Sequence, residues 1–159
     1  MLHIKAPDYS YGNHFGFTIF LGGSIEMDKA EHWQDRLANG LADEDVLLLN
    51  PRRDDWDSSW VQDPTPGTQF HTQVTWELNA QDSADLLVYY FDPATVSPIT
   101  LLELGAYGGS EPEAVVVCCP PSYFRYGNVA IFCERYGIEL VHSYEELLSY
   151  IKSMINDIS

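Results

Sequence analysis

The chain has 159 residues, of which 45% are hydrophobic, and its 24 acidic and 8 basic residues give a formal net charge of -16. This length and apolar content suit one domain with a two- or three-layer core. Because a nucleic-acid-binding surface needs clustered Lys and Arg against phosphates, the composition argues against DNA or RNA as a partner.

The N-terminal part of the chain predicts an arm, a strand and a helix. Residues 1–16 are polar and aromatic without a clear period, and we interpret them as an arm that packs on a neighbouring subunit, while residues 17–159 form the single domain. Residues 17–21 predict a strand, and residues 22–24 a tight turn into a helix at about residues 28–41. Two glycines in this turn let a ligand approach the backbone, although an ordinary strand-to-helix turn also explains them.

An irregular stretch follows a second predicted strand at residues 46–50 and continues to Pro66-Gly67. It contains Arg53, Trp56 and Trp60. Indole faces stack on planar nucleobases while polar groups read their edges, which favours a functional loop. The alternative is a loop that its tryptophans pin to the surface.

The rest of the chain continues the alternation of strands and helices. Residues 70–83 predict a helix, and the apolar residues 86–91 predict a buried strand that Asp92-Pro93 ends. Later elements are a strand at residues 114–119, a helix near 129–136, a strand at 137–141 and a closing helix after Ser143. Such alternation implies an α/β fold with a five-stranded parallel sheet, helices on both faces and strand order 2-1-3-4-5.

Residues 97–109 lie directly beyond the third predicted strand and have helical spacing until Gly108-Gly109 stop it. Glu103 is therefore expected on the first turn of a helix at the carboxyl end of a strand, where ligand crevices form in open α/β sheets. Thr100-x-x-Glu103 also fits a capping box, in which Glu103 accepts the backbone N–H of Thr100. The helix dipole is expected to keep the carboxylate ionised under both interpretations.

Cys118, Cys119 and Cys133 form neither an even disulfide set nor a zinc-binding spacing, so we expect reduced core residues and no metal. No apolar run approaches the roughly 18 residues that span a bilayer, and residues 1–16 lack the pattern of an export signal. A soluble, cytoplasmic protein without a membrane partner is expected.

Five motifs occur in order along residues 17–141. They are Phe20-Leu21-Gly22-Gly23-Ser24-Ile25, Asn50-Pro51-Arg52-Arg53, Gln73-x-x-Trp76-Glu77, Ala84-Asp85 and Ser97-Pro98-Ile99-Thr100-Leu101-Leu102-Glu103-Leu104-Gly105. Their order and spacing resemble the nucleoside 2-deoxyribosyltransferase family. The resemblance implies a flavodoxin-like fold, an oligomer, and exchange of the nucleobase of a 2'-deoxynucleoside with a free nucleobase, without a cofactor.

The resemblance implies two catalytic carboxylates. Glu103 matches the nucleophile that attacks the anomeric carbon and forms a covalent 2-deoxyribosyl ester, which a second base then opens from the same face. Two carboxylates about 5 Å apart serve this purpose in retaining glycosidases. Glu77 stands where the family usually has an aspartate, and we assign it proton transfer to and from the base.

Other residues are expected to bind the substrate without taking part in the reaction. They are Phe20, Gly22, Gly23, Ser24, Arg53, Trp56, Trp60, Gln73, Asp92, Ser97 and Asn128. Asn128 matches an asparagine that a neighbouring subunit contributes, which would make a dimer the smallest complete site. Alternatively, Gly127-Asn128 simply starts a helix.

Some positions differ from the family pattern. Phe20 replaces a tyrosine whose hydroxyl contacts the nucleophile, so another group must supply that hydrogen bond. Ser97 replaces an aspartate of the transferases. A serine at this position, like Ser24, resembles the related 2'-deoxynucleoside 5'-monophosphate N-glycosidases. Glu26, however, stands where those hydrolases have an arginine. Since a carboxylate repels a phosphate, a free nucleoside is favoured. The alternatives to a transferase are an enzyme that hydrolyses the same glycosidic bond and a nucleotide-binding module without activity.

Overall fold

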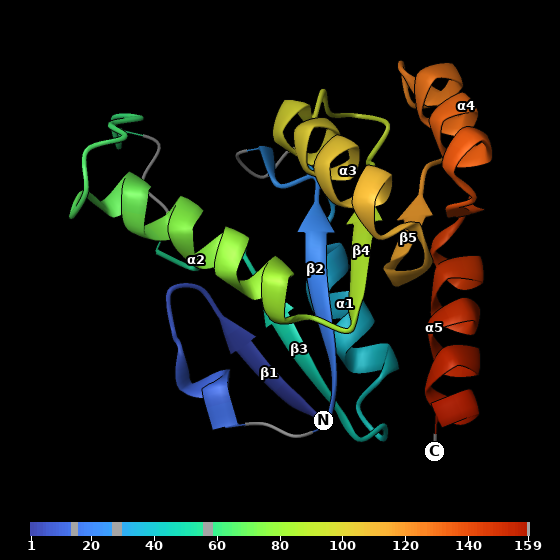
Figure 1. Ribbon diagram of the computed structural model, residues 1–159, viewed down its shortest axis with the longest axis horizontal. Coiled ribbons are helices and arrows are strands. Elements are labelled where there is room, and N and C mark those ends of the chain that lie inside the picture. Colours follow the sequence, from blue (N-terminus) through green and yellow to red (C-terminus); the bar gives the residue numbers. More distant parts are fainter. Residues whose placement is uncertain (14–15, 27–29, 56–58, 159) are drawn as a thin grey trace.

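The computed structural model describes residues 1–13, 16–26, 30–55 and 59–158, which form a parallel sheet between two layers of helices (Figure 1). The strands are β1 (Leu2–Lys5), β2 (Phe17–Gly23), β3 (Val46–Asn50), β4 (Leu86–Tyr90), β5 (Val115–Cys118) and β6 (Glu139–Val141). The helices are α1 (Trp33–Gly40), α2 (Gln69–Ser83), α3 (Pro98–Ser110), α4 (Tyr126–Tyr136) and α5 (Tyr144–Ile158), with 3-10 turns at Ser10–Asn13 and Pro112–Ala114.

The sheet order across the described residues is β1-β3-β2-β4-β5-β6, and every hydrogen-bonded pair of strands runs parallel. Without β1 this is the predicted order 2-1-3-4-5, so the flavodoxin-like α/β fold is confirmed. The sheet has six strands rather than five because Leu2–Lys5 pairs with β3 at the edge, from Leu2 opposite Leu47 to Lys5 opposite Asn50. Among the four residues of β1 only Ile4 is buried, which is too little to produce a visible hydrophobic period.

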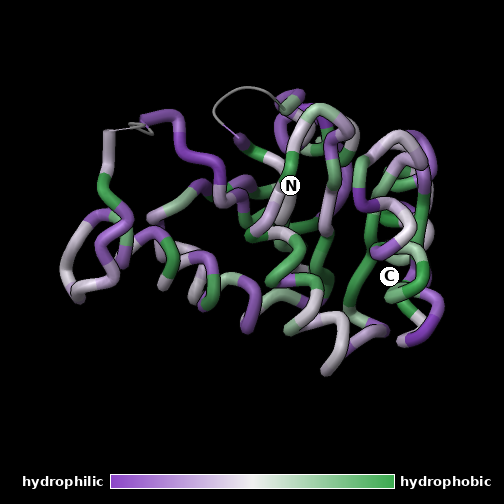
Figure 2. The backbone as a smooth tube through the Cα atoms, turned by 90° about the horizontal axis from the view of Figure 1, so that it is seen from above, coloured by the Kyte–Doolittle hydropathy of each residue, from purple (hydrophilic) through white to green (hydrophobic). Residues whose placement is uncertain are grey.

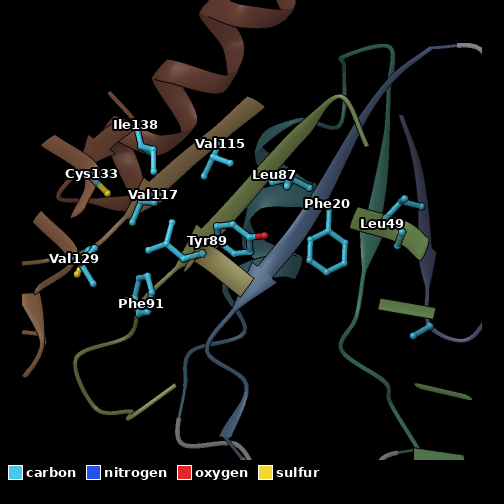
Figure 3. Close-up of a cluster of buried hydrophobic side chains, with 14 of the residues drawn as sticks. Phe20, Leu49, Leu87, Tyr89, Phe91, Val115, Val117, Val129, Cys133 and Ile138 are labelled. Atoms are coloured by element: carbon cyan, nitrogen blue, oxygen red, sulfur yellow. The ribbon is translucent and has the colours of Figure 1, made fainter. Parts of the chain in front are cut away.

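The side chains of each strand alternate between two apolar cores. On one face, Phe20, Leu87 and Tyr89 pack with residues of α2, α3 and α4 (Figure 3). On the other face, Ile19 and Val88 pack with α1 and α5. This alternation follows from the two-residue period of a strand that is buried on both faces. Hydrophobic stretches accordingly gather in the middle of the molecule, and hydrophilic residues follow its outer loops (Figure 2).

Two predicted helix boundaries are wrong. Helix α3 continues through Gly108 and Gly109 to Ser110. A Cβ atom at position 108 would lie 2.7 Å from Cδ1 of Ile138. Gly108 therefore permits close packing of α3 rather than ending it. Helix α1 begins at Trp33, because residues 30–32 are not helical; residues 28 and 29 of the predicted helix lie outside the described residues.

The three cysteines are free and buried, as expected. Burial raises the pKa of Cys118 and Cys119 to about 12 and that of Cys133 to about 11, so all three thiols stay protonated near neutral pH. Among the described helices, none is both long enough and apolar enough to span a bilayer.

Candidate active site

A cavity of about 500 Å³ lies between α2 and α3 at the carboxyl end of β2. Its described lining consists of Phe20, Gly22, Gly23, Ile25, Glu26, Pro51, Gln62, Phe70, Gln73, Val74, Glu77, Leu78, Ser97, Pro98, Ile99, Thr100, Leu102, Glu103, Ala106 and Tyr107. The location agrees with the rule for open α/β sheets, and the size is typical of small-molecule sites. Of the predicted site residues, Phe20, Gly22, Gly23, Gln73, Glu77, Ser97 and Glu103 come together here.

Glu103 accepts the last hydrogen bond of a chain that begins at Tyr89 and passes through Gln81. Gln81 Nε2 donates to Glu103 Oε1 at 2.9 Å, and the hydroxyl of Tyr89 donates to Gln81 Oε1 at 2.7 Å. Helix α3 begins at Pro98, so Thr100 lies inside the helix and is not its N-cap. The capping-box alternative is therefore wrong, and Glu103 belongs to the wall of the cavity.

Gln81 is a residue that the sequence motifs do not single out. It supplies the donor that Phe20 cannot, and its signal in the sequence is its place one helical turn after Glu77.

The second carboxylate, Glu77, projects from α2 into the same cavity. Gln73, one turn earlier, donates from Nε2 to Glu77 Oε1 at 2.8 Å and to the carbonyl of Pro51 at 2.9 Å. Gln73 is almost fully buried, so these bonds fix the orientation of Glu77.

The protonation of this pair differs from the sequence-based expectation. Burial and then the nearby charge of Glu77 raise the pKa of Glu103 to about 8, and only the bond from Gln81 opposes them. Burial also raises the pKa of Glu77, against the bond from Gln73. The expectation that the helix dipole keeps Glu103 ionised is wrong, because Glu103 is the sixth residue of α3 and the dipole acts mainly on the first turn. Near neutral pH the pair holds a proton.

Ser97 and Ser24 belong to a cluster of hydroxyls behind the cavity wall. Ser24 Oγ lies 2.5 Å from Ser97 Oγ and 2.8 Å from Thr95 Oγ1, and it accepts the N–H of Asp92 at 2.9 Å. Ser97 lines the cavity, whereas Ser24 is buried beneath it. These contacts join the turn after β2 to the loop before α3.

The glycines of the first motif allow the turn to lie close to β4. A Cβ atom at Gly22 would come within 2.9 Å of the rings of Phe20 and Tyr89. Gly23 has a φ of 144°, and a Cβ atom there would lie 2.4 Å from the carbonyl oxygen of Tyr90. Both positions require glycine for packing. Because glycine has no side chain, the backbone itself forms the cavity wall at these two positions.

Only part of the irregular stretch between β3 and α2 lies at the cavity. Pro51 and Gln62 line the cavity, but Arg53 and Trp60 do not. Arg53 donates two hydrogen bonds of 2.8 Å to Asp55, and its guanidinium lies 4.9 Å from the ring centroid of Trp60. Trp56 lies outside the described residues.

Asp92 and Asn128 also lie away from the described wall. The carboxylate of Asp92 accepts the N–H of Ala94 at 2.8 Å within its own loop and the N–H of Glu31 at 3.1 Å, which joins this loop to the segment before α1. Asn128 is exposed in the first turn of α4. A contribution of Asn128 to a second subunit's site stays a prediction.

Comparison with known proteins gives the family of the chain. Residues 16–123 match the family model described as "Nucleoside 2-deoxyribosyltransferase like". No curated protein matches the chain. The matched region begins just before β2 and ends after β5, so it includes α2, α3 and both carboxylates. The chain therefore belongs to the nucleoside 2-deoxyribosyltransferase-like family.

Proposed function

We propose that the protein is a nucleoside 2-deoxyribosyltransferase, which exchanges the nucleobase of 2'-deoxynucleosides and retains the configuration at C1'. The observation that carries the proposal is the pair Glu77 and Glu103, which project from two helices into one cavity in a chain of this family. A cavity lined mainly by apolar groups and two carboxylates that hold a proton between them suits glycosidic-bond chemistry.

In the first step, ionised Glu103 attacks C1' through a carboxylate oxygen and forms an ester. The C1'–N bond breaks, its electron pair goes to the base nitrogen, and Glu77 gives that base the proton. The bond from Gln81 stabilises the ionised form of Glu103 that this step needs.

In the second step, an incoming base loses a proton to Glu77, and its nitrogen attacks C1' from the face that the first base left. The ester bond breaks and Glu103 leaves as a carboxylate, so the two steps balance without a cofactor. Buried and partly buried apolar side chains in the lining, such as Phe20 and Val74, disfavour water as the acceptor, which supports exchange over hydrolysis.

We also propose that the active form is a homo-oligomer. Large apolar side chains on α3, on α4 and in the segment before α4 are exposed, namely Ile99, Leu102, Phe124 and Ile131. Exposed apolar groups gathered on neighbouring elements favour a protein partner, and a second copy would bring Asn128 to the cavity of its neighbour.

The test is to incubate the protein with 2'-deoxyinosine and adenine and to separate the products by chromatography. The proposal predicts deoxyadenosine, and Glu103→Gln is expected to abolish it while binding of 2'-deoxyinosine survives. Free deoxyribose in place of deoxyadenosine would identify a hydrolase. Wild-type exchange by Glu103→Gln would show that the nucleophile is wrongly assigned.

A further inference from the structure

A third carboxylate, that of Glu26, is fixed on the cavity wall at the start of α3. Its Oε1 atom accepts the N–H of Val96 at 2.7 Å and the N–H of Ser97. Glu26 and Ser97 both have left-handed backbone, with φ of 22° and 50°. The loop after β2 is thus held in a strained conformation that places a negative charge in front of Pro98, the first residue of α3.

The charged side chains in the described lining of the cavity are all acidic. The described residues that line the cavity include Glu26, Glu77 and Glu103 but no Lys, Arg or His. In the described part of the chain, both hydrogen bonds to Glu26 end on Oε1 and Oε2 receives none. A phosphate group here would face carboxylates without a cation, whereas a hydroxyl could donate to Oε2.

The position of Glu26 relative to the reacting atoms follows from α3. Ser97 and Glu103 are six residues apart, which corresponds to about 9 Å along a helix. If C1' lies at Glu103 and the base lies towards Glu77 on α2, the rest of the sugar extends along α3. Its 5' end then reaches the end of the cavity that Glu26 forms.

We propose that Glu26 determines specificity at the 5' end of the sugar, where it accepts a hydrogen bond from a free 5'-hydroxyl and excludes a 5'-phosphate. This inference rests on the proposed function and narrows its substrates to nucleosides, as distinct from nucleoside 5'-monophosphates. The serine hydroxyls nearby do not offset the charge, because Ser24, Thr95 and Ser97 bond to one another.

The experiment compares 2'-deoxyinosine with 2'-deoxyinosine 5'-monophosphate, with adenine as acceptor, and measures hypoxanthine release by wild-type protein and Glu26→Gln. Glutamine keeps an oxygen for the two backbone N–H groups and removes the charge. Glu31→Gln is the matched control, because Glu31 lies in the same loop region, pairs with Arg36 at 3.2 Å and does not line the cavity. The quantity is the ratio of kcat/KM for the monophosphate to that for the nucleoside, which the folded fraction does not affect.

Wild-type protein is expected to favour the nucleoside, and Glu26→Gln to raise the ratio by about tenfold or more, with no change for Glu31→Gln. An unchanged ratio in Glu26→Gln, or wild-type preference for the monophosphate, would overturn the role of Glu26 while exchange itself stands. A wild-type protein that releases hypoxanthine from neither compound would instead contradict the proposed function. If there is no turnover, calorimetric titration of both compounds into Glu103→Gln and into Glu26→Gln/Glu103→Gln gives the ratio of their Kd values. A change in this ratio between the two proteins decides the role of Glu26.

Discussion

The two faces of the sheet differ in how their helices are built. On one face, α5 buries Leu147, Ile151 and Ile155 against the strands and leaves its acidic residues outside. On the other face, α2 buries Gln73 and Gln81 beside Trp76, while Ile99 and Leu102 of α3 remain exposed. The regular apolar stripe of α5 closes a core, whereas the buried glutamines of α2 and the exposed apolar side chains of α3 belong to helices beside the cavity. The candidate active site lies on the face of α2 and α3.

The largest expected difference between the faces is in catalysis at Glu77. Glu77→Gln keeps the shape of the side chain and its bond to Gln73 but removes proton transfer, so the rate of exchange should fall by roughly 10²-fold or more. Steady-state kinetics with 2'-deoxyinosine and adenine measure the fall. Glu134→Gln, an exposed change on α4, is the control and should be neutral. A rate within a factor of two of wild type in Glu77→Gln would exclude Glu77 as the proton donor.

Changes on the opposite face should affect stability and leave catalysis intact. Leu147 has no exposed surface, so Leu147→Ala should lower the free energy of unfolding by about 2–5 kcal/mol. Denaturant titration measures this loss. Ile158→Ala, at an exposed position of the same helix, should change it by less than about 0.5 kcal/mol. Should Leu147→Ala lower kcat/KM per folded molecule as far as Glu77→Gln does, the division between the faces would fail.

A smaller effect is expected on the pH dependence of kcat/KM, which should show whether Gln81 controls the ionisation of Glu103 or only packs beside it. Because the first step needs Glu103 ionised and Glu77 protonated, kcat/KM should fall with rising pH as the pair loses its proton, near the pKa of about 8 of Glu103. Gln81→Leu removes the hydrogen bond that lowers this pKa, so the fall should move to higher pH, and the rate at pH 7 should be lower by about tenfold because Glu103 keeps the proton of the pair.

Tyr89→Phe removes the hydrogen bond to Gln81 Oε1 but leaves the bond from Gln81 to Glu103, so it should move the fall in the same direction by less. A pH profile of Gln81→Leu that is lower throughout but not shifted would assign Gln81 a purely structural role.

The sequence predicts the fold well where burial is continuous. The apolar runs of β2, β3 and β4 are buried on both faces and carry their own signal, and their order places the cavity at the start of α3. β1 shows no such signal, because an edge strand with one buried residue has almost no hydrophobic pattern. The glycine at position 108 inside α3 is explained by Ile138, 30 residues later in the sequence, whose side chain leaves no room for a Cβ atom there.

The candidate site is predicted in its residues but not in its electrostatics. Motif order identifies Glu77 and Glu103, yet the raised pKa of Glu103 depends on burial and on a charge from another helix. The bond from Gln81 and the contact of Glu26 with the start of α3 join residues 22 and about 70 positions apart. Such contacts between distant segments are visible only in the folded chain.

The central claim is that Glu103 forms a covalent bond with the sugar, and mass spectrometry of the intact protein tests it most directly. Wild-type protein mixed with 2'-deoxyinosine and no acceptor base, then quenched in acid, should gain the mass of one 2-deoxyribosyl group, and peptide mapping should place it on Glu103. Glu103→Gln should gain nothing, and added adenine should discharge the wild-type adduct as deoxyadenosine. Base exchange by a wild-type protein that carries no adduct under these conditions, or an adduct on another residue, would contradict the account.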